Sequence, residues 1–345
     1  MHSQTYRAAK DAFARKRANL NERARILAAI KTFFASEGFA EVETPILQLS
    51  PGMEVHLNAF ETKFEDITHT APQTLMLHTS PEFAMKKLLG FGMEKIYQFA
   101  HVFRNEIVSP THYPEFIMLE WYRAHEGYEK LMSDCEKILA ATAPVLTRDN
   151  MKCDTQHGLE KLTVAEAMDR YCDGLDLMAT IDDSAAPTPA KITAETTSRG
   201  INVSASDTWD DVFEKLMLEF VEPSLGQGKP TILYEYPLHL AALSAPKKTA
   251  PNIAERFELY ACGVELANAF TELTDAEIQL ERFARDMAEK KRLYNKEYPI
   301  DMEFIEAVAD MPPSTGIALG FERLVMLATG TGNIRDVMWS EIPGV

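Results

Sequence analysis

The charged side chains of FRNEIVSPTHYPEFIMLEWY, residues 103–122, are of the types that bind a nucleotide. Arg104 offers a planar fork of donors suited to a phosphate. Glu106 offers an acceptor for an exocyclic amine, and Phe116 offers a flat face for a purine. The alternative, which this stretch alone leaves open, is an ordinary hairpin with a salt bridge.

A β-hairpin is expected to position these side chains. Residues 96–103 and 116–122 are rich in aromatic and β-branched residues, which favour strands. Ser109, Pro110 and Pro114 interrupt the segment between them and predict a loop.

A second stretch, RFELYACGVELANAFTEL, also suits a binding site. Glu258 and Glu265 are seven residues apart in it. Asn268, Phe270 and Glu272 alternate with other residues, so a strand would place these three side chains on one face.

Near the C-terminal end, GIALGFERLVML predicts a strand of small residues that leads into a helix with Arg323 in its first turn. These three stretches resemble motif 2, the strand before motif 3, and motif 3 of the class II aminoacyl-tRNA synthetases. GFAEVETPIL, residues 38–47, resembles their motif 1, a dimer-interface element that ends in Pro45. SPE at 80–82, FRNE at 103–106 and ELANAF are similar to the lysine-specific branch. The resemblance covers most of the chain from residue 20 onward and implies an α+β fold, an antiparallel sheet flanked by helices.

The resemblance implies a site that activates a carboxylic acid with ATP and Mg²⁺. Attack of a carboxylate on the α-phosphorus brings two anions together, which arginines and a metal ion make possible. Arg104 resembles the α-phosphate clamp, and Arg323 resembles the arginine at the far end of the triphosphate; both are expected to be catalytic. Glu258 and Glu265 resemble a pair of metal-binding carboxylates. The residues expected to bind ATP are Arg104, Asn105, Glu106, His112, Tyr113, Phe116, Glu258, Leu259, Gly320 and Arg323.

The same resemblance implies an amino-acid pocket that recognises an ammonium group, which needs carboxylates to offset its lost hydration. Glu120, Tyr122 and Glu272 match the residues around the ε-ammonium of a lysine-like substrate, and Glu82 matches the carboxylate at its reacting end. Each of these two carboxylates also has a structural alternative. Glu82 could be an ordinary charge at a helix N-terminus, and Glu120 could be part of a surface acidic cluster. The residues expected to bind the amino acid are Ser80, Pro81, Glu82, Glu120, Tyr122, Glu265, Asn268, Phe270, Glu272 and Ala318.

The position of motif 1 bears on the function that the resemblance implies. Lysyl-tRNA synthetases have a long N-terminal anticodon-binding barrel, whereas motif 1 ends here at Pro45. The chain is therefore similar to the elongation factor P lysine ligases, which attach lysine or (R)-β-lysine to a lysine side chain of that factor. Ala318, where lysyl synthetases usually have glycine, agrees with this; Tyr113 and Ala269 depart from the ligases' usual asparagine and glycine.

Elongation factor P, lysine or (R)-β-lysine, and ATP are the expected partners, and tRNA is not expected to be one. Two alternatives stay open. One is a free-standing lysyl-tRNA synthetase-like enzyme that charges tRNA, and the other is a non-catalytic lysine-sensing paralogue.

Composition and charge limit the remaining possibilities. A chain of 345 residues that is 46% hydrophobic can bury a large core, and its net charge of −17 argues against a nucleic acid as main partner. The four cysteines have spacings that suit neither a zinc site nor a compact disulfide framework, so reduced thiols in the cytoplasm are expected. No apolar run has the length of a membrane helix, and no membrane partner is expected.

The expected organisation is a basic N-terminal extension, residues 1–20, and one catalytic domain, residues 21–345, with an insertion at about 149–230. Apolar residues at helical spacing predict a helix from Asn21 to Glu37, which Gly38 ends. This helix and motif 1 are expected to form a symmetric homodimer interface.

Other elements follow from local patterns. FAEVETPIL alternates as a strand would until Pro45 ends it, and residues 55–62 and 74–80 predict two more strands in a region without recognisable chemistry. Ser80, Pro81 and Glu82 predict the start of a helix, and residues 126–146 have the period of another.

Overall fold

The computed structural model describes residues 2–65, 68, 72–183, 186–241, 243–342 and 344. The strands in this part of the chain are β1 (Ala40–Glu41), β2 (Leu47–Gln48), β3 (Phe60–Phe64), β4 (Gln73–Leu77), β5 (Lys95–Phe103), β6 (Glu115–Ala124), β7 (Val145–Arg148), β8 (Met151–Asp154), β9 (Glu160–Thr163), β10 (Thr231–Tyr234), β11 (Pro246–Lys247), β12 (Ala250–Ala254), β13 (Arg256–Ala261), β14 (Val264–Thr271) and β15 (Ser314–Gly320). The α-helices are α1 (His2–Ser36), α2 (Glu82–Gly90), α3 (Tyr128–Thr142), α4 (Val164–Tyr171), α5 (Ala190–Ser198), α6 (Trp209–Leu216), α7 (Ala276–Tyr294), α8 (Met302–Asp310) and α9 (Phe321–Thr329).

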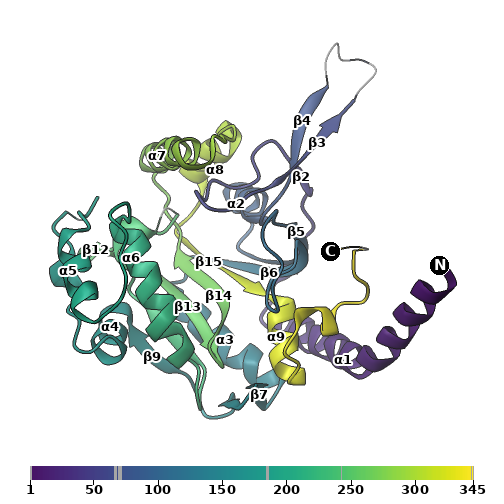
Figure 1. The fold of residues 1–345 in the computed structure, drawn as a ribbon. Helices are drawn as coiled ribbons and strands as arrows, with labels where there is room; N and C mark the ends of the chain where they lie inside the picture. Colours follow the sequence, from purple (N-terminus) through teal and green to yellow (C-terminus); the bar gives the residue numbers. More distant parts are fainter. Residues whose placement is uncertain are drawn as a thin grey trace.

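A large sheet runs through the molecule. Within the described residues it has eight strands in the order β1-β5-β6-β15-β14-β13-β10-β9. Its central strands are antiparallel, whereas β1 pairs parallel with β5 and β9 pairs parallel with β10 at the two edges. The expected α+β fold is confirmed, with helices around the sheet (Figure 1) and with parallel pairing only at its edges in the part described.

The expected hairpin is formed by β5 and β6, which pair antiparallel from Lys95 opposite Arg123 to Phe103 opposite Glu115. Side chains along these strands alternate between the two faces of the sheet. In β6, Leu119 and Trp121 enter the main hydrophobic core, which α1, α3 and α9 cover. The opposite face of the sheet is left to carry a site.

Helix α1 begins much earlier than the predicted Asn21, so the basic extension is part of the same helix. Alanine, lysine and arginine in that stretch are strong helix formers. Lys16 is buried, and its ammonium donates to the carbonyl of Arg335 (3.3 Å) and pairs with Glu341 (3.3 Å). The C-terminal segment therefore holds this half of α1 in place.

Two other predicted helices are confirmed. Helix α2 begins after Pro81 and ends before Phe91, close to the expected boundaries. Helix α3 buries Leu131, Cys135 and Ile138 as its period predicts.

The prediction of a continuous motif 1 strand is wrong. Only Ala40–Glu41 and Leu47–Gln48 are strands, because the chain leaves the sheet edge before Pro45, which has no N–H to donate. The strand predicted at 55–62 begins only at Phe60, and residues 54–57 form a loop beside the site.

The segment predicted as an insertion contributes α4, α5 and α6, which gather at the β9 end of the sheet in Figure 1. They enclose a second hydrophobic core around Trp209 and Phe213. Whether this unit is an insertion stays a prediction. Among the described residues, none of the helices has both the length and the apolar character that a bilayer crossing needs.

Candidate active site

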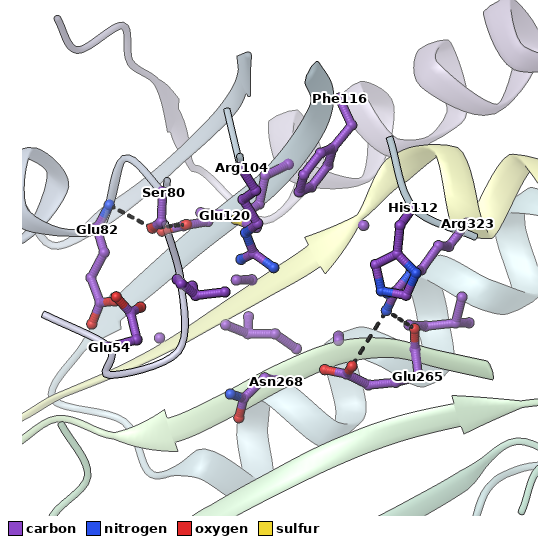
Figure 2. A pocket seen from close by; sticks show the side chains of 18 of the residues that line it. Glu54, Ser80, Glu82, Arg104, His112, Phe116, Glu120, Glu265, Asn268 and Arg323 are labelled. Carbon is purple, nitrogen blue, oxygen red and sulfur yellow. Dashed lines mark hydrogen bonds and ion pairs between the residues drawn. The ribbon is translucent and has the colours of Figure 1, made fainter. Parts of the chain in front are cut away.

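A cavity of about 590 Å³ lies over the free face of the sheet. Most of the expected site residues line it, from β6, β14, β15, the start of α9 and the loop after β5 (Figure 2). The expected residues outside this lining are Pro81, Asn105, Glu258, Leu259 and Glu272.

The register of the strands explains how distant residues meet. Directly paired residues put their side chains on the same face. Glu258 pairs with Asn268, Asn268 with Ala318, and Ala318 with Glu120, so these four form a row across the sheet. Leu259 follows Glu258 and points the other way into the main core, so only its backbone could contact a ligand on this side.

The floor of the cavity is β15, whose residues on this face are small. Gly316 stands beside Tyr122 and Glu272, and a Cβ at Gly316 would collide with both side chains. Ala318 and Gly320 continue the same face of the strand. Polar side chains from β6 and β14 can therefore meet above a shallow trough.

One end of the cavity is basic. Arg104 lies over the ring of Phe116, with its guanidinium carbon 5.4 Å from the ring centroid, and its Nε is buried without a hydrogen-bond partner. Arg323 donates to the carbonyl of Glu265 (2.8 Å) and to Nε2 of His112 (2.9 Å). Burial, and then the charges of Arg323 and Arg104, lower the pKa of His112, so this imidazole is neutral at pH 7. This end suits a polyanion.

The expected metal-binding pair is divided between two environments. Glu265 lines the cavity and lies 3.3 Å from Arg323. Glu258 is nearly buried and accepts hydrogen bonds from Tyr236 and Tyr260 (2.6 Å each) while it pairs with Arg256 (2.5 Å). No group of three or more metal-ligating side chains occurs among the described residues.

The other end of the cavity is acidic. Glu120 is buried and accepts hydrogen bonds from Ser80 (2.5 Å) and Tyr122 (2.9 Å). Burial, and then the charge of Glu82, raise the pKa of Glu120 to about 8. A buried carboxyl group of this kind is a strong receptor for a cation, because the cation offsets its lost hydration.

Lys86 is a residue of this end that the sequence analysis missed. Its buried ammonium pairs with Glu82 and lies 2.5 Å from Glu272, above the ring of Phe270. Burial alone would lower the pKa of Lys86, but Glu272 and Glu82 raise it above its ordinary value. The spacing of Glu82 and Lys86, four residues apart on a helix, was the available signal.

Glu272 is therefore present at this end, but its carboxylate is buried, pairs with Lys86 and lies outside the cavity lining. Burial raises the pKa of Glu272, and Lys86 opposes that shift. Glu54, from the loop before β3, also lines the acidic end and was missed. No local pattern marks it, since only the folded loop brings it to the site.

Comparisons with known proteins agree with the motifs. Residues 3–339 match the family model described as tRNA synthetases class II (D, K and N). The chain is also 38% identical over 325 residues to the elongation factor P–(R)-β-lysine ligase of Yersinia enterocolitica, with 93% of this chain and 94% of that protein covered. The expectation of a synthetase-like ligase is confirmed, and the chain belongs to the family of class II tRNA synthetases for D, K and N.

Proposed function

We propose that this protein uses ATP to activate lysine or (R)-β-lysine as an aminoacyl-adenylate, and then transfers the aminoacyl group to a lysine side chain of elongation factor P. The opposite charges at the two ends of one cavity are the observation that carries the proposal. A basic end suits the triphosphate, and an acidic end suits a substrate with two ammonium groups. The relative from Yersinia enterocolitica supports the choice of acceptor.

In the first step, an oxygen of the amino-acid carboxylate attacks the α-phosphorus of ATP, and the bond to the departing pyrophosphate breaks. Arg104 binds the α-phosphate, where negative charge grows in the transition state. Arg323 binds the far end of the triphosphate, and Phe116 stacks on the adenine.

In the second step, the neutral amine of the acceptor lysine attacks the carbonyl carbon of the adenylate. AMP leaves with the electron pair of the broken bond, and the proton of the amine passes to solvent. Neither step requires a nucleophile from the protein, so positioning and charge stabilisation are the main tasks of the site.

Glu120 and Tyr122 bind the ε-ammonium group, Phe270 covers the methylene chain, and Glu82 binds the ammonium at the reacting end. Asn268 orients the carboxylate. Its side-chain oxygen accepts from Nε of Arg256 (3.2 Å), which leaves its amide nitrogen as a donor for the substrate.

Glu265 and Glu258 are the proposed Mg²⁺ ligands. Two carboxylates fit this ion, which takes one or two of them together with phosphate oxygens and water. The bound ion would neutralise phosphate charge during the first step. Glu265, with its side chain 39% exposed, is accessible to a bound nucleotide, whereas Glu258 must exchange a contact with Arg256.

The protein is proposed to act as a cytoplasmic homodimer. Ile46 and Leu47 end the segment that resembles motif 1, and Leu49 follows it. Each is more than one-third exposed, as is Phe64 on β3. Exposed apolar side chains that are close together in the sequence, as Ile46, Leu47 and Leu49 are, favour burial against a second subunit. Light scattering after size exclusion should give twice the 38.8 kDa mass of the chain.

Two assays test the function. ATP–pyrophosphate exchange with lysine and with (R)-β-lysine measures the first step, and transfer of the labelled amino acid to elongation factor P and to tRNA, side by side, measures the second. Efficient charging of tRNA without transfer to the factor would favour the synthetase alternative. No exchange with either amino acid would favour a lysine sensor.

A further inference from the structure

Glu54 has a buried carboxylate oxygen, Oε2, without a hydrogen-bond partner, and its side chain lines the acidic end of the cavity. Figure 2 shows the carboxylates of Glu54 and Glu82 directed toward one another. Glu82 is paired with Lys86, which does not bond to Glu54. A buried acceptor without a partner lowers the stability of the fold, and a hydrogen-bond donor or a cation in contact with the carboxylate would remove this cost.

The loop that carries Glu54 is held firmly. Nζ of the fully buried Lys290 donates to the carbonyl oxygens of Glu54 (3.2 Å), Val55 (3.0 Å) and Leu57 (2.5 Å). At Gly52 the backbone has a φ of 142°, and a Cβ there would lie 2.6 Å from Oε2 of Glu54. These contacts fix the backbone of the loop, and the missing side chain of Gly52 leaves room for the Glu54 carboxylate.

The charges on both sides of Glu54 define what it can receive. Burial raises the pKa of the Glu54 carboxyl, and the charge of Glu82 raises it further, while Arg104 and Lys290 act in the opposite direction. A cation placed between Glu54 and Glu82 would remove their mutual repulsion. Lys290 does not serve as this cation, because its ammonium group donates its hydrogen bonds to three backbone carbonyls.

We propose that Glu54 and Glu82 together bind the ammonium group at the reacting end of a diamino acid, and that Glu54 makes this ammonium a requirement for binding. This rests on the proposed function and deepens it. An acid that carries only the distal ammonium would leave Glu54 without a cation, next to Glu82, which is already paired with Lys86. Such an acid would be rejected, whichever carbon of an accepted substrate carries the amino group.

The test compares lysine and (R)-β-lysine with 6-aminohexanoate, which keeps the carboxylate and the distal ammonium but has no amino group at the reacting end. Exchange rates and calorimetric binding are measured for wild type, Glu54→Gln and Glu54→Asp. Glu61→Gln, exposed on β3, is the matched control.

We expect Glu54→Gln to reduce the preference for lysine over 6-aminohexanoate by about 10- to 100-fold, the effect of one hydrogen bond to a charged group. Glu54→Asp should restore part of it, and Glu61→Gln should leave it unchanged. The KM for ATP should stay within about twofold, since Glu54 acts on the amino acid.

An unchanged preference in Glu54→Gln overturns the proposal, as does a rise in the KM for ATP alone, which would make Glu54 a residue that orients Arg104. Calorimetry separates this failure from failure of the proposed function. If wild type binds lysine more tightly than 6-aminohexanoate but catalyses no exchange, the function is wrong and Glu54 is still tested by the binding data.

Discussion

Lysine should bind more tightly as the pH rises from 6 to 8, because Glu120 must be ionised to receive an ammonium group. The raised pKa of Glu120, about 8, results first from burial and then from the charge of Glu82, against which Ser80, Tyr122 and Lys86 act. An ammonium beside this carboxylate would lower its pKa again. Below pH 8 the carboxyl group of Glu120 must therefore lose its proton when lysine binds. Because the proton competes with the ammonium group, lysine binds more weakly at lower pH.

The expected magnitude follows from the pKa. Each unit of pH below 8 increases the ratio of protonated to ionised Glu120 tenfold, so the Kd should be about 10-fold weaker near pH 7 and about 100-fold weaker near pH 6 than for the ionised form. Glu120→Gln cannot ionise, so its Kd should depend little on pH. It should be about 10- to 100-fold weaker than wild type near pH 8.5 and should approach wild type near pH 6.

Isothermal titration calorimetry in two buffers of different ionisation enthalpy measures both the Kd and the number of protons released. About 0.9 proton should leave per lysine bound near pH 7. Glu115→Gln, on the same strand with its side chain 41% exposed, is the control and should behave as wild type. A Kd that is constant between pH 6 and 8.5, or an equal slope in Glu120→Gln, would refute the reasoning.

Three further outcomes are expected. Lys86→Met should lower the free energy of unfolding, measured with urea near pH 7, by about 3 kcal/mol because it leaves buried carboxyl groups unpaired. Lys291→Met, which removes an exposed ion pair with Glu297, should cost about 1 kcal/mol or less, and equal losses would contradict this. Glu265→Gln should raise the Mg²⁺ concentration for half-maximal exchange about tenfold without changing the urea midpoint, and full activity at limiting Mg²⁺ would exclude Glu265 as a ligand. Ala318→Gly should raise kcat/KM for lysine relative to (R)-β-lysine by about 10- to 200-fold, because one methyl group is removed from a rigid floor; an unchanged ratio would exclude Ala318 as the discriminating residue.

Sequence patterns predicted those parts of the site that strands and helix starts position. The alternation along β14 placed Asn268 and Phe270 on one face, because the period of a strand is a local property. Glu120 was assigned to the pocket by the resemblance. The motif match suggested a contact from Leu259, but alternation puts its side chain on the face opposite Glu258, in the main core. A motif match names a residue without saying whether its side chain or its backbone makes the contact.

The residues that were missed depend on contacts between distant parts of the chain. Glu54 reaches the cavity because Lys290, on α7, binds the carbonyls of its loop, and no pattern around Glu54 indicates this partner. The extent of α1 was missed for a similar reason. Its basic half was read as an extension, whereas Lys16 and Arg23 contact the C-terminal segment of the chain.

The small residues on β15 explain how one sheet can hold two opposite charges in one cavity. Gly316 and Ala318 lie between β6 and β14, and strands in a sheet are about 4.8 Å apart, so Glu120 and Asn268 stand about 10 Å apart across the trough. A larger residue on this floor would separate the side chains above it and fill the space where the substrate chain must lie. The floor carries no charge of its own, so the carboxylates at one end and the arginines at the other act on a bound molecule without a competing group beneath it. The proposed binding mode follows this distribution of charge. It puts the ammonium groups of the amino acid toward Glu120 and Glu82 and its carboxylate toward Arg104, which is the orientation that attack on a phosphate requires.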